Sequence, residues 1–237
     1  MALSQGKRRE ITMYSFRNDY SEGAHPKVLQ ALADTNLRQT VGYGMDPCCQ
    51  AAADTIRRLC AAPDAAVHFL VGGTQVNLVT IDAFLQSYEA VVAAQTGHVS
   101  THETGAIEAT GHKVCTVESP DGKLTPALVE SVLAGHNGTE HMVLPRMVYI
   151  SDTTEIGTVY TRAELAALRQ CCDVHGLFLY LDGARLGSAL TSPDNDLTLP
   201  ELAALTHAFT IGGTKNGALF GEALVLTRPM PHFRWHM

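Results

Sequence analysis

Short apolar runs alternate with amphipathic stretches along most of this chain. Apolar runs bounded by glycine or polar residues predict buried strands at residues 66–71, 90–94, 113–117, 146–150, 177–181, 208–211 and 218–227. Apolar positions three and four apart predict helices at residues 47–60, 74–88, 125–134, 161–174 and 199–205. Strands that are apolar throughout and separated by helices indicate a mostly parallel sheet with helices on both faces, which is an α/β fold.

Two of the predicted helices have clear start signals. Thr125 stands directly before Pro126, a capping residue followed by a proline suited to the first helical turn. Thr161 is followed three residues later by Glu164, which is the spacing of a capping box.

Composition and charge narrow the class of protein. The chain has 237 residues, of which 46% are hydrophobic and 17% charged, enough for one large domain, or a domain and a half, with a sizeable core. The net charge of −7 argues against a nucleic-acid partner, because phosphate backbones are bound by basic patches. The basic cluster Lys7-Arg8-Arg9 lies in an N-terminal extension, residues 1–12, which we expect to be a solvated tail.

The apolar runs and the cysteines indicate the cellular compartment of the protein. No apolar run is long enough to cross a bilayer and the N-terminus lacks the apolar core of a signal peptide, so we expect a cytoplasmic protein without a membrane partner. The six cysteines are Cys48, Cys49, Cys60, Cys115, Cys171 and Cys172. Two pairs are vicinal and none has CxxC spacing, so we expect packed thiols, with neither a metal site nor disulfides.

Candidate chemistry lies where strands end, since ligands of open α/β sheets bind at the carboxyl ends of strands. Gly72 and Gly73 follow a predicted strand, and Thr74 opens a helix. Glycines let the backbone approach a ligand, and a helix N-terminus offers free N–H groups, so a phosphate fits there. A simple turn between strand and helix is the alternative.

Two further strand ends carry charged residues. Asp182 ends an apolar strand, where it is either a helix cap or loop acid, or a carboxylate aimed at the ring nitrogen of pyridoxal 5′-phosphate (PLP). Lys215 lies among small residues after the next strand, where it is either a solvated loop lysine or a desolvated amine suited to forming a Schiff base.

His98 follows the strand predicted at residues 90–94. It could stack on a flat ring or carry a proton. A hydrogen-bonded loop histidine is the alternative, and the chain has 11 histidines.

The order of glycine turn, histidine, aspartate and lysine resembles the fold-type I PLP enzymes. More narrowly, the chain resembles the low-specificity threonine aldolase branch of the aromatic amino acid beta-eliminating lyase/threonine aldolase family. The resembling stretches are FRND at residues 16–19, GYGMDP at 42–47, GGTQVN at 72–77, HVSTHETGA at 98–106, DGARLGSA at 182–189 and GGTKNG at 212–217. Together they span most of residues 13–227.

The resemblance implies a role for each cofactor residue. Lys215 would form the Schiff base with PLP, Asp182 would pair with the pyridine nitrogen, and His98 would stack on the ring and serve as the candidate general base. The phosphate would be held by Gly73 and Thr74, with Gly72 adjacent. No metal is implied.

The resemblance also implies the reaction and its substrate contacts. Arg185 and Asn18 would contact the substrate carboxylate. The substrate would be L-threonine or L-allo-threonine, cleaved between Cα and Cβ to glycine and acetaldehyde. Tyr43 lies in a loop that in relatives approaches a neighbouring subunit, so a homodimer or homotetramer is expected; a packed loop aromatic is the alternative.

The sequence departs from the family pattern at two places. Thr214 stands before the lysine where the family commonly has serine. Thr153-Thr154-Glu155 stands where several aldolases carry a histidine in the loop after a strand, so substrate preference is open and His102 could partly compensate.

The last residues bear on activity. By the resemblance, residues 13–237 form the large PLP-binding domain, and a small C-terminal domain that supplies another substrate-binding arginine would follow. We therefore expect the final FRWHM to leave a large aromatic side chain without packing partners. Two alternatives remain: a PLP-binding fragment without activity, and a different PLP lyase that releases ammonia and a keto acid.

Overall fold

The computed structural model describes residues 13–136 and 138–237; the expected N-terminal extension, with its basic cluster, lies outside them. Seven strands of the described chain form one sheet in the order β1-β7-β6-β5-β4-β2-β3. Their bounds are β1 Ala66–Leu70, β2 Glu89–Ala94, β3 Lys113–Val117, β4 Leu144–Ser151, β5 Phe178–Asp182, β6 Ala208–Gly212 and β7 Glu222–Leu226. Each contains or overlaps a strand predicted from the apolar runs.

Strand β7 reverses the direction of an otherwise parallel sheet. It pairs antiparallel with both β1 and β6, whereas the pairs β2–β3, β2–β4, β4–β5 and β5–β6 are parallel. A parallel return to the sheet needs a crossover of about a dozen residues or more, and residues 213–221 between β6 and β7 are too few for one. The predicted mostly parallel α/β sheet is therefore confirmed, with one reversed strand.

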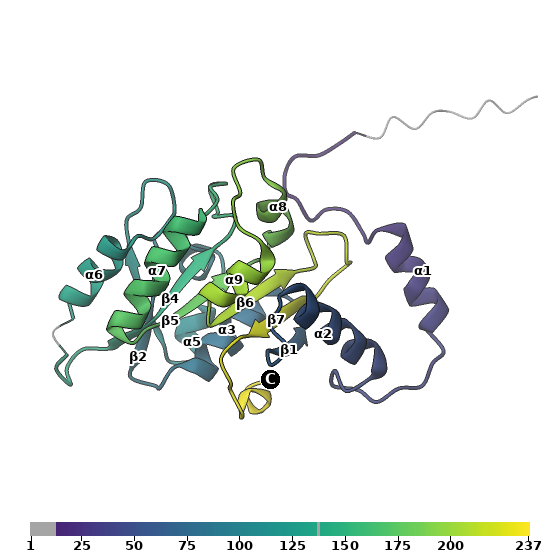
Figure 1. The fold of residues 1–237 in the computed structure, drawn as a ribbon, viewed down its shortest axis with the longest axis horizontal. Coiled ribbons are helices and arrows are strands. Elements are labelled where there is room, and N and C mark those ends of the chain that lie inside the picture. The colour runs from purple at the N-terminus through teal and green to yellow at the C-terminus, as the bar shows by residue number, and fades with distance from the viewer. Residues whose placement is uncertain (1–12, 137) are drawn as a thin grey trace, which may run out of the picture.

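Helices cover both faces of the sheet (Figure 1). Their bounds are α1 Pro26–Thr35, α2 Pro47–Leu59, α3 Gly73–Phe84, α4 His98–Thr101, α5 Ala106–Ala109, α6 Pro126–Ala134, α7 Arg162–His175, α8 Leu186–Thr191 and α9 Leu199–Leu205, and a 3-10 turn, η1, spans Phe233–Trp235. Among these described helices, none combines the length and the apolar character that a bilayer crossing needs.

Two apolar clusters form the core, one on each face of the sheet. Successive β4 residues alternate between them: Met147 and Tyr149 pack with α3 and α5, whereas Val148 and Ile150 pack with α6, α7 and α9. This period of two is what a strand buried on both faces requires. Helix α1 lies away from this body in Figure 1 and contributes no buried residue.

The predicted helix starts are confirmed. The Thr125 side chain accepts from the Leu128 N–H at 3.3 Å, and Thr161 and Glu164 form a reciprocal capping box. Two predicted bounds are wrong: α3 ends at Phe84 rather than residue 88, and β7 begins at Glu222 rather than residue 218. Positive φ angles at Gly217, Leu219 and Gly221 keep the chain before β7 from being extended.

The final residues are divided between core and surface. Phe233 is only 1% exposed and its ring lies 4.7 Å from that of His68, so it is part of the core. Trp235, two residues on, is 87% exposed. One large aromatic of the final segment is thus left without packing, as expected, whereas the other packs through η1 into the core.

Candidate active site

A cavity of about 340 Å³ lies at the carboxyl end of the sheet, where the sequence placed its candidate chemistry. Strand ends, the first turn of α3 and the β6–β7 loop supply its walls. Its lining includes Gly72, Gly73, Thr74, Asn77, His98, Glu155, Asp182, Arg185, Lys215 and Glu222. Of the predicted site residues, Asn18 lies outside this lining and borders adjoining hollows that share Lys215 or Arg185.

Asp182 is buried at the end of β5 and is held by three donors. Its Oδ2 accepts from the Tyr149 hydroxyl at 2.7 Å and from Asn77 Nδ2 at 2.9 Å, and its Oδ1 accepts from the Ala184 N–H at 2.9 Å. Burial raises the pKa of Tyr149 well above its usual value, so the phenol keeps the proton it donates. A buried carboxylate with these donors is fixed in direction and satisfied in hydrogen bonding.

Asn77 connects Asp182 to a second buried acid. Its Nδ2 also donates to Glu103 Oε1 at 2.6 Å, and its Oδ1 accepts from the Tyr180 hydroxyl at 2.7 Å. Because both protons and the carbonyl of this amide are engaged, its orientation is determined by the network.

His98 continues the network to the rim of the cavity. Its Nδ1 lies 2.8 Å from Glu103 Oε1, and this hydrogen bond raises the pKa of His98 above its usual value. The backbone N–H of His98 donates to Glu155 Oε1 at 2.9 Å, which anchors the start of α4. The imidazole is thus held through Nδ1 by Glu103, and the His98 backbone is held separately by Glu155.

Glu155 places a carboxylate where the sequence departs from the aldolase pattern. Its Oε1 also accepts from the Ser151 hydroxyl at 2.6 Å, at the end of β4. The His102 ring lies 5.5 Å from the His98 ring, and both histidines border a hollow shared with Glu155 and Lys215. Two ionisable side chains therefore flank His98 on the open side of the cavity.

Lys215 lies half-buried in the β6–β7 loop, with Nζ 5.8 Å from the centre of the Tyr20 ring. Glu222 holds this loop: its carboxylate accepts from the Gly213 N–H at 3.2 Å and from the Thr214 hydroxyl at 3.1 Å. Burial raises the pKa of Glu222. Threonine at 214 thus supplies the hydroxyl that the family's serine would, and turns it toward Glu222.

Close backbone packing brings the aspartate and lysine segments together. A Cβ on Gly183 would lie 2.0 Å from the Thr210 carbonyl oxygen, and one on Gly212 would lie 2.3 Å from that of Ala184. Only glycine fits at either position, so the ends of β5 and β6 can touch.

The glycine turn opens α3 toward the cavity. Gly72 is the cap residue of the helix and no side chain caps the first turn, so its N–H groups point out of the helix without a side-chain acceptor. A Cβ on Gly72 or Gly73 would meet nothing within 4 Å. The turn therefore borders open space, as a phosphate site at a helix N-terminus requires.

Arg185 is engaged by an acid that the sequence did not single out. Its Nε and Nη2 bind the two carboxylate oxygens of Asp19 at 2.5 and 3.0 Å, and this lowers the pKa of Asp19. The neighbouring Asn18 uses its side-chain oxygen locally, accepting from Tyr20 N–H and the Ser21 hydroxyl. The Asp19 carboxylate thus binds the Arg185 guanidinium that the resemblance assigns to the substrate carboxylate.

The sequence did not single out the residues that hydrogen-bond to the predicted site residues and hold them in place. These are Asn77, Glu103, Tyr149 and Glu222. Asn77 and Glu103 fall inside the motif stretches, which was the available signal; nothing in the apolar pattern around Tyr149 or Glu222 marked them.

The site fits a PLP-type cofactor. A lysine amine, a fixed carboxylate and a free helix N-terminus line one cavity, and these are the groups that bind the aldehyde, the ring nitrogen and the phosphate of PLP. Together with the sheet, they define the large domain of a fold-type I PLP enzyme. A methionine aminotransferase of Escherichia coli, 17% identical, shares this fold over 91% of the chain with a TM-score of 0.69.

More narrowly, the chain belongs to the beta-eliminating lyase family, which matches residues 16–230. A solved structure of a threonine aldolase from Leishmania major is 55% identical, with a TM-score of 0.92, and the match covers 94% of this chain and 66% of that one. A low specificity L-threonine aldolase of Pseudomonas aeruginosa is 34% identical over 212 residues, which is 89% of this chain and 61% of that protein. A yeast protein of the same name is 27% identical. The chain thus spans about three fifths of the length of these curated relatives.

Proposed function

We propose that this chain is the cofactor-binding part of a PLP-dependent aldolase that cleaves β-hydroxy amino acids, L-threonine or L-allo-threonine, to glycine and an aldehyde. The observation that carries the proposal is the convergence of Lys215, Asp182 and His98 on one cavity. The names of the relatives point to the same reaction.

In this proposal, each cofactor residue has one task. The Lys215 amine binds the cofactor covalently, and Asp182 keeps the ring nitrogen protonated. The N–H groups of Gly73 and Thr74 hold the phosphate, with Gly72 giving it room. When bound, PLP supplies an electron sink next to the substrate Cα, and the protein residues orient the bond to be broken.

The substrate carboxylate must take a place that Asp19 now fills. Arg185 binds carboxylates through two parallel N–H groups, and the Asp19 pair demonstrates that geometry in this chain. We infer that Asp19 gives way to the incoming carboxylate and that Asn18, one residue earlier, adds a hydrogen bond from its amide.

His98 is the proposed general base for the β-hydroxyl proton. Glu103 stabilises the imidazolium that forms when the proton is taken, and Glu155 fixes the backbone on which the imidazole is mounted. His102 is proposed to assist at the open side, in place of the family's histidine.

Product analysis tests this function. The full chain, loaded with PLP, is incubated with threonine, serine and an aromatic amino acid, and glycine, aldehyde, ammonia and keto acids are measured. Glycine and acetaldehyde from threonine, abolished by Lys215→Ala, are expected. Ammonia with a keto acid would show a different lyase, and bound PLP without turnover would show a fragment lacking activity.

The proposal extends to assembly and location. Phe16 and Tyr43 are 99% and 97% exposed, which supports a surface covered by a second copy in a homodimer or homotetramer. The six cysteines are free, which fits the reducing cytoplasm. The described residues would then be the large domain of such an assembly, and light scattering of the purified chain measures its copy number.

A further inference from the structure

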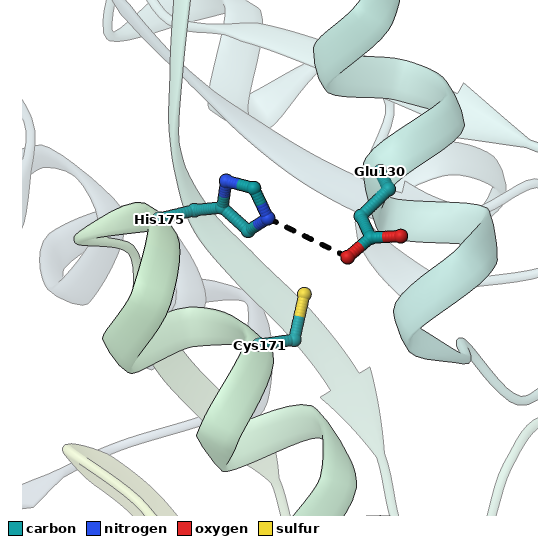
Figure 2. Close-up of side chains that lie close together, drawn as sticks. All are labelled: Glu130, Cys171 and His175. Carbon is teal, nitrogen blue, oxygen red and sulfur yellow. Dashed lines mark ion pairs between the residues drawn. The ribbon is translucent and has the colours of Figure 1, made fainter.

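Helices α6 and α7 bring together three side chains that the aldolase reaction does not use. Cys171 and His175 lie four residues apart on α7, so they project from the same face one turn apart. Glu130 on α6 points toward both of them, and Figure 2 shows the three side chains converging. None of the three lines the cofactor cavity.

The spacing of the donor atoms is close to that of a metal site. Glu130 Oε1 and His175 Nε2 are 3.5 Å apart, and all the donor atoms lie within 4.8 Å of one another. Donors bound to tetrahedral zinc at its usual bond lengths are about 3.3–3.6 Å apart. The distance between Glu130 Oε1 and His175 Nε2 already matches this spacing. A rotation of the Cys171 side chain would bring its sulfur to a similar distance.

The three side chains differ in exposure, so one ligand is held in place by packing while the other two are accessible to an ion from solvent. Cys171 is buried between the helices, whereas the side chains of His175 and Glu130 are 36% and 57% exposed. Its neighbour Cys172 is fully buried in the sheet-side core. Both thiols of the vicinal pair thus belong to one core cluster, and that of Cys171 also lies near the acid and the imidazole.

We propose that Glu130, Cys171 and His175 form a binding site for a divalent transition metal, with Zn²⁺ as the ion that suits this donor set. Thiolate sulfur, imidazole nitrogen and carboxylate oxygen are the ligands of zinc in proteins, and three of them leave the fourth position to water. On binding, the Cys171 thiol releases its proton to solvent and its sulfur bonds the metal. The thiolate and carboxylate then balance the two positive charges.

The site would link two helices of one sheet face. The metal would bridge α6 to the last turn of α7, in place of the Glu130–His175 ion pair of the metal-free chain. Because binding requires the folded arrangement, the metal stabilises the native state.

Cobalt titration of the full chain tests the proposal. Co²⁺ bound to a thiolate gives a near-ultraviolet charge-transfer band, and we expect this band to saturate at one ion per chain and to be displaced by Zn²⁺. Cys171→Ser should abolish the band, whereas the control Cys48→Ser, at an exposed thiol, should leave it unchanged. Absence of the band, or its persistence in Cys171→Ser, would overturn the proposal.

His175→Ala and Glu130→Gln provide a test that does not depend on a buried residue. Each removes a donor from an exposed position, and each should weaken Co²⁺ binding at least about tenfold. Zn²⁺ at a hundredfold excess over its dissociation constant should raise the melting temperature of the unaltered chain by about 5 °C, and this rise should be lost in His175→Ala. Equal cobalt affinity or an equal rise in the variants would contradict the site.

Discussion

A chain of hydrogen bonds runs from His98 through Glu103 and Asn77 to Asp182. It joins the proposed base at the rim of the cavity to the carboxylate at its floor. Every link is between buried or half-buried groups, where hydrogen bonds are stronger and an unpaired group is costly. The two ends of the site are therefore held by one network rather than by separate supports.

The His98–Glu103 contact makes stability depend on pH. The folded-state pKa of His98 is raised, so its contribution is fully present below the unfolded pKa of about 6.5 and is lost as pH rises through the folded value. We expect the stability advantage of the unaltered chain over His98→Gln to shrink as the pH rises above about 6.5, the ordinary pKa of histidine.

Urea unfolding at several pH values measures this advantage. His141→Gln, at an exposed histidine, serves as the control and should show no comparable trend. An advantage of His98 that stays constant or grows with pH would contradict the stabilising contact between His98 and Glu103.

His102 is the second residue whose proposed role can be tested by substitution. If it assists in place of the missing histidine, His102→Ala should lower kcat/KM for threonine by about tenfold, less than loss of a main general base. Its side chain is exposed, so folding should be unaffected. Steady-state kinetics on the PLP-loaded chain decide this, and unchanged kinetics would remove His102 from the account.

The sequence could predict which residues line the cavity but not which residues hold them. Lys215, Asp182, His98 and the glycine turn were predictable because each follows an apolar run, and strand ends meet at one edge of a sheet. The hydrogen-bond partners of Asp182 could not be predicted, because a contact such as that between Tyr149 and Asp182 depends on the register of the strands. The Asp19–Arg185 pair joins residues 166 positions apart, which no local pattern reports.

At the scale of elements, the first turn of α3 carries the proposed phosphate site. Its N–H groups have no side-chain cap, and Gly72 and Gly73 leave the space in front of them open. The sequence did not predict helix α1, nor the short helices α4, α5 and α8, which have too few turns to give a detectable periodicity.

Gly73→Ala separates the phosphate site from the fold. The added methyl group meets no protein atom within 4 Å, so stability should change by less than about 1 kcal/mol. It would project into the proposed phosphate position, so PLP affinity should fall by about tenfold or more, a loss of ~1.4 kcal/mol.

Fluorescence titration with PLP, alongside thermal unfolding, measures both quantities. Gly135→Ala, at the end of α6 and away from the cavity, is the matched control and should leave PLP affinity unchanged. Unaltered affinity in Gly73→Ala would place the phosphate elsewhere.

At the scale of the whole molecule, the sheet and its two covered faces hold the site in place. The reversed strand β7 lies between β1 and β6 and carries Glu222, so the lysine loop is held by the strand that joins β1 to the rest of the sheet. The turn η1 then returns to the core through Phe233. The apolar pattern predicted the sheet and most helices, but the burial of Phe233 depends on tertiary packing that a short segment does not encode.

Phe233→Ala tests whether the C-terminal turn contributes to stability. Removing a fully buried aromatic ring should cost about 3–5 kcal/mol and lower the melting temperature by roughly 10 °C. Trp235→Ala, at the exposed neighbour, should change stability by no more than about 0.5 kcal/mol. Calorimetry measures the melting temperature of both variants. An equal loss of stability in the two would show that Phe233 is not packed in the core.

We propose that Lys215 anchors PLP in the cavity beside Asp182. Borohydride reduction of the PLP-loaded chain converts the lysine–cofactor linkage to a stable amine, and peptide mapping by mass spectrometry locates it. The other lysines, Lys7, Lys27, Lys113 and Lys123, serve as internal controls. We predict a visible absorbance band before reduction and the label on the peptide that contains Lys215, both lost in Lys215→Ala and retained in Lys113→Ala. A label on any of the other lysines, or a band that persists in Lys215→Ala, would show that Lys215 does not bind the cofactor.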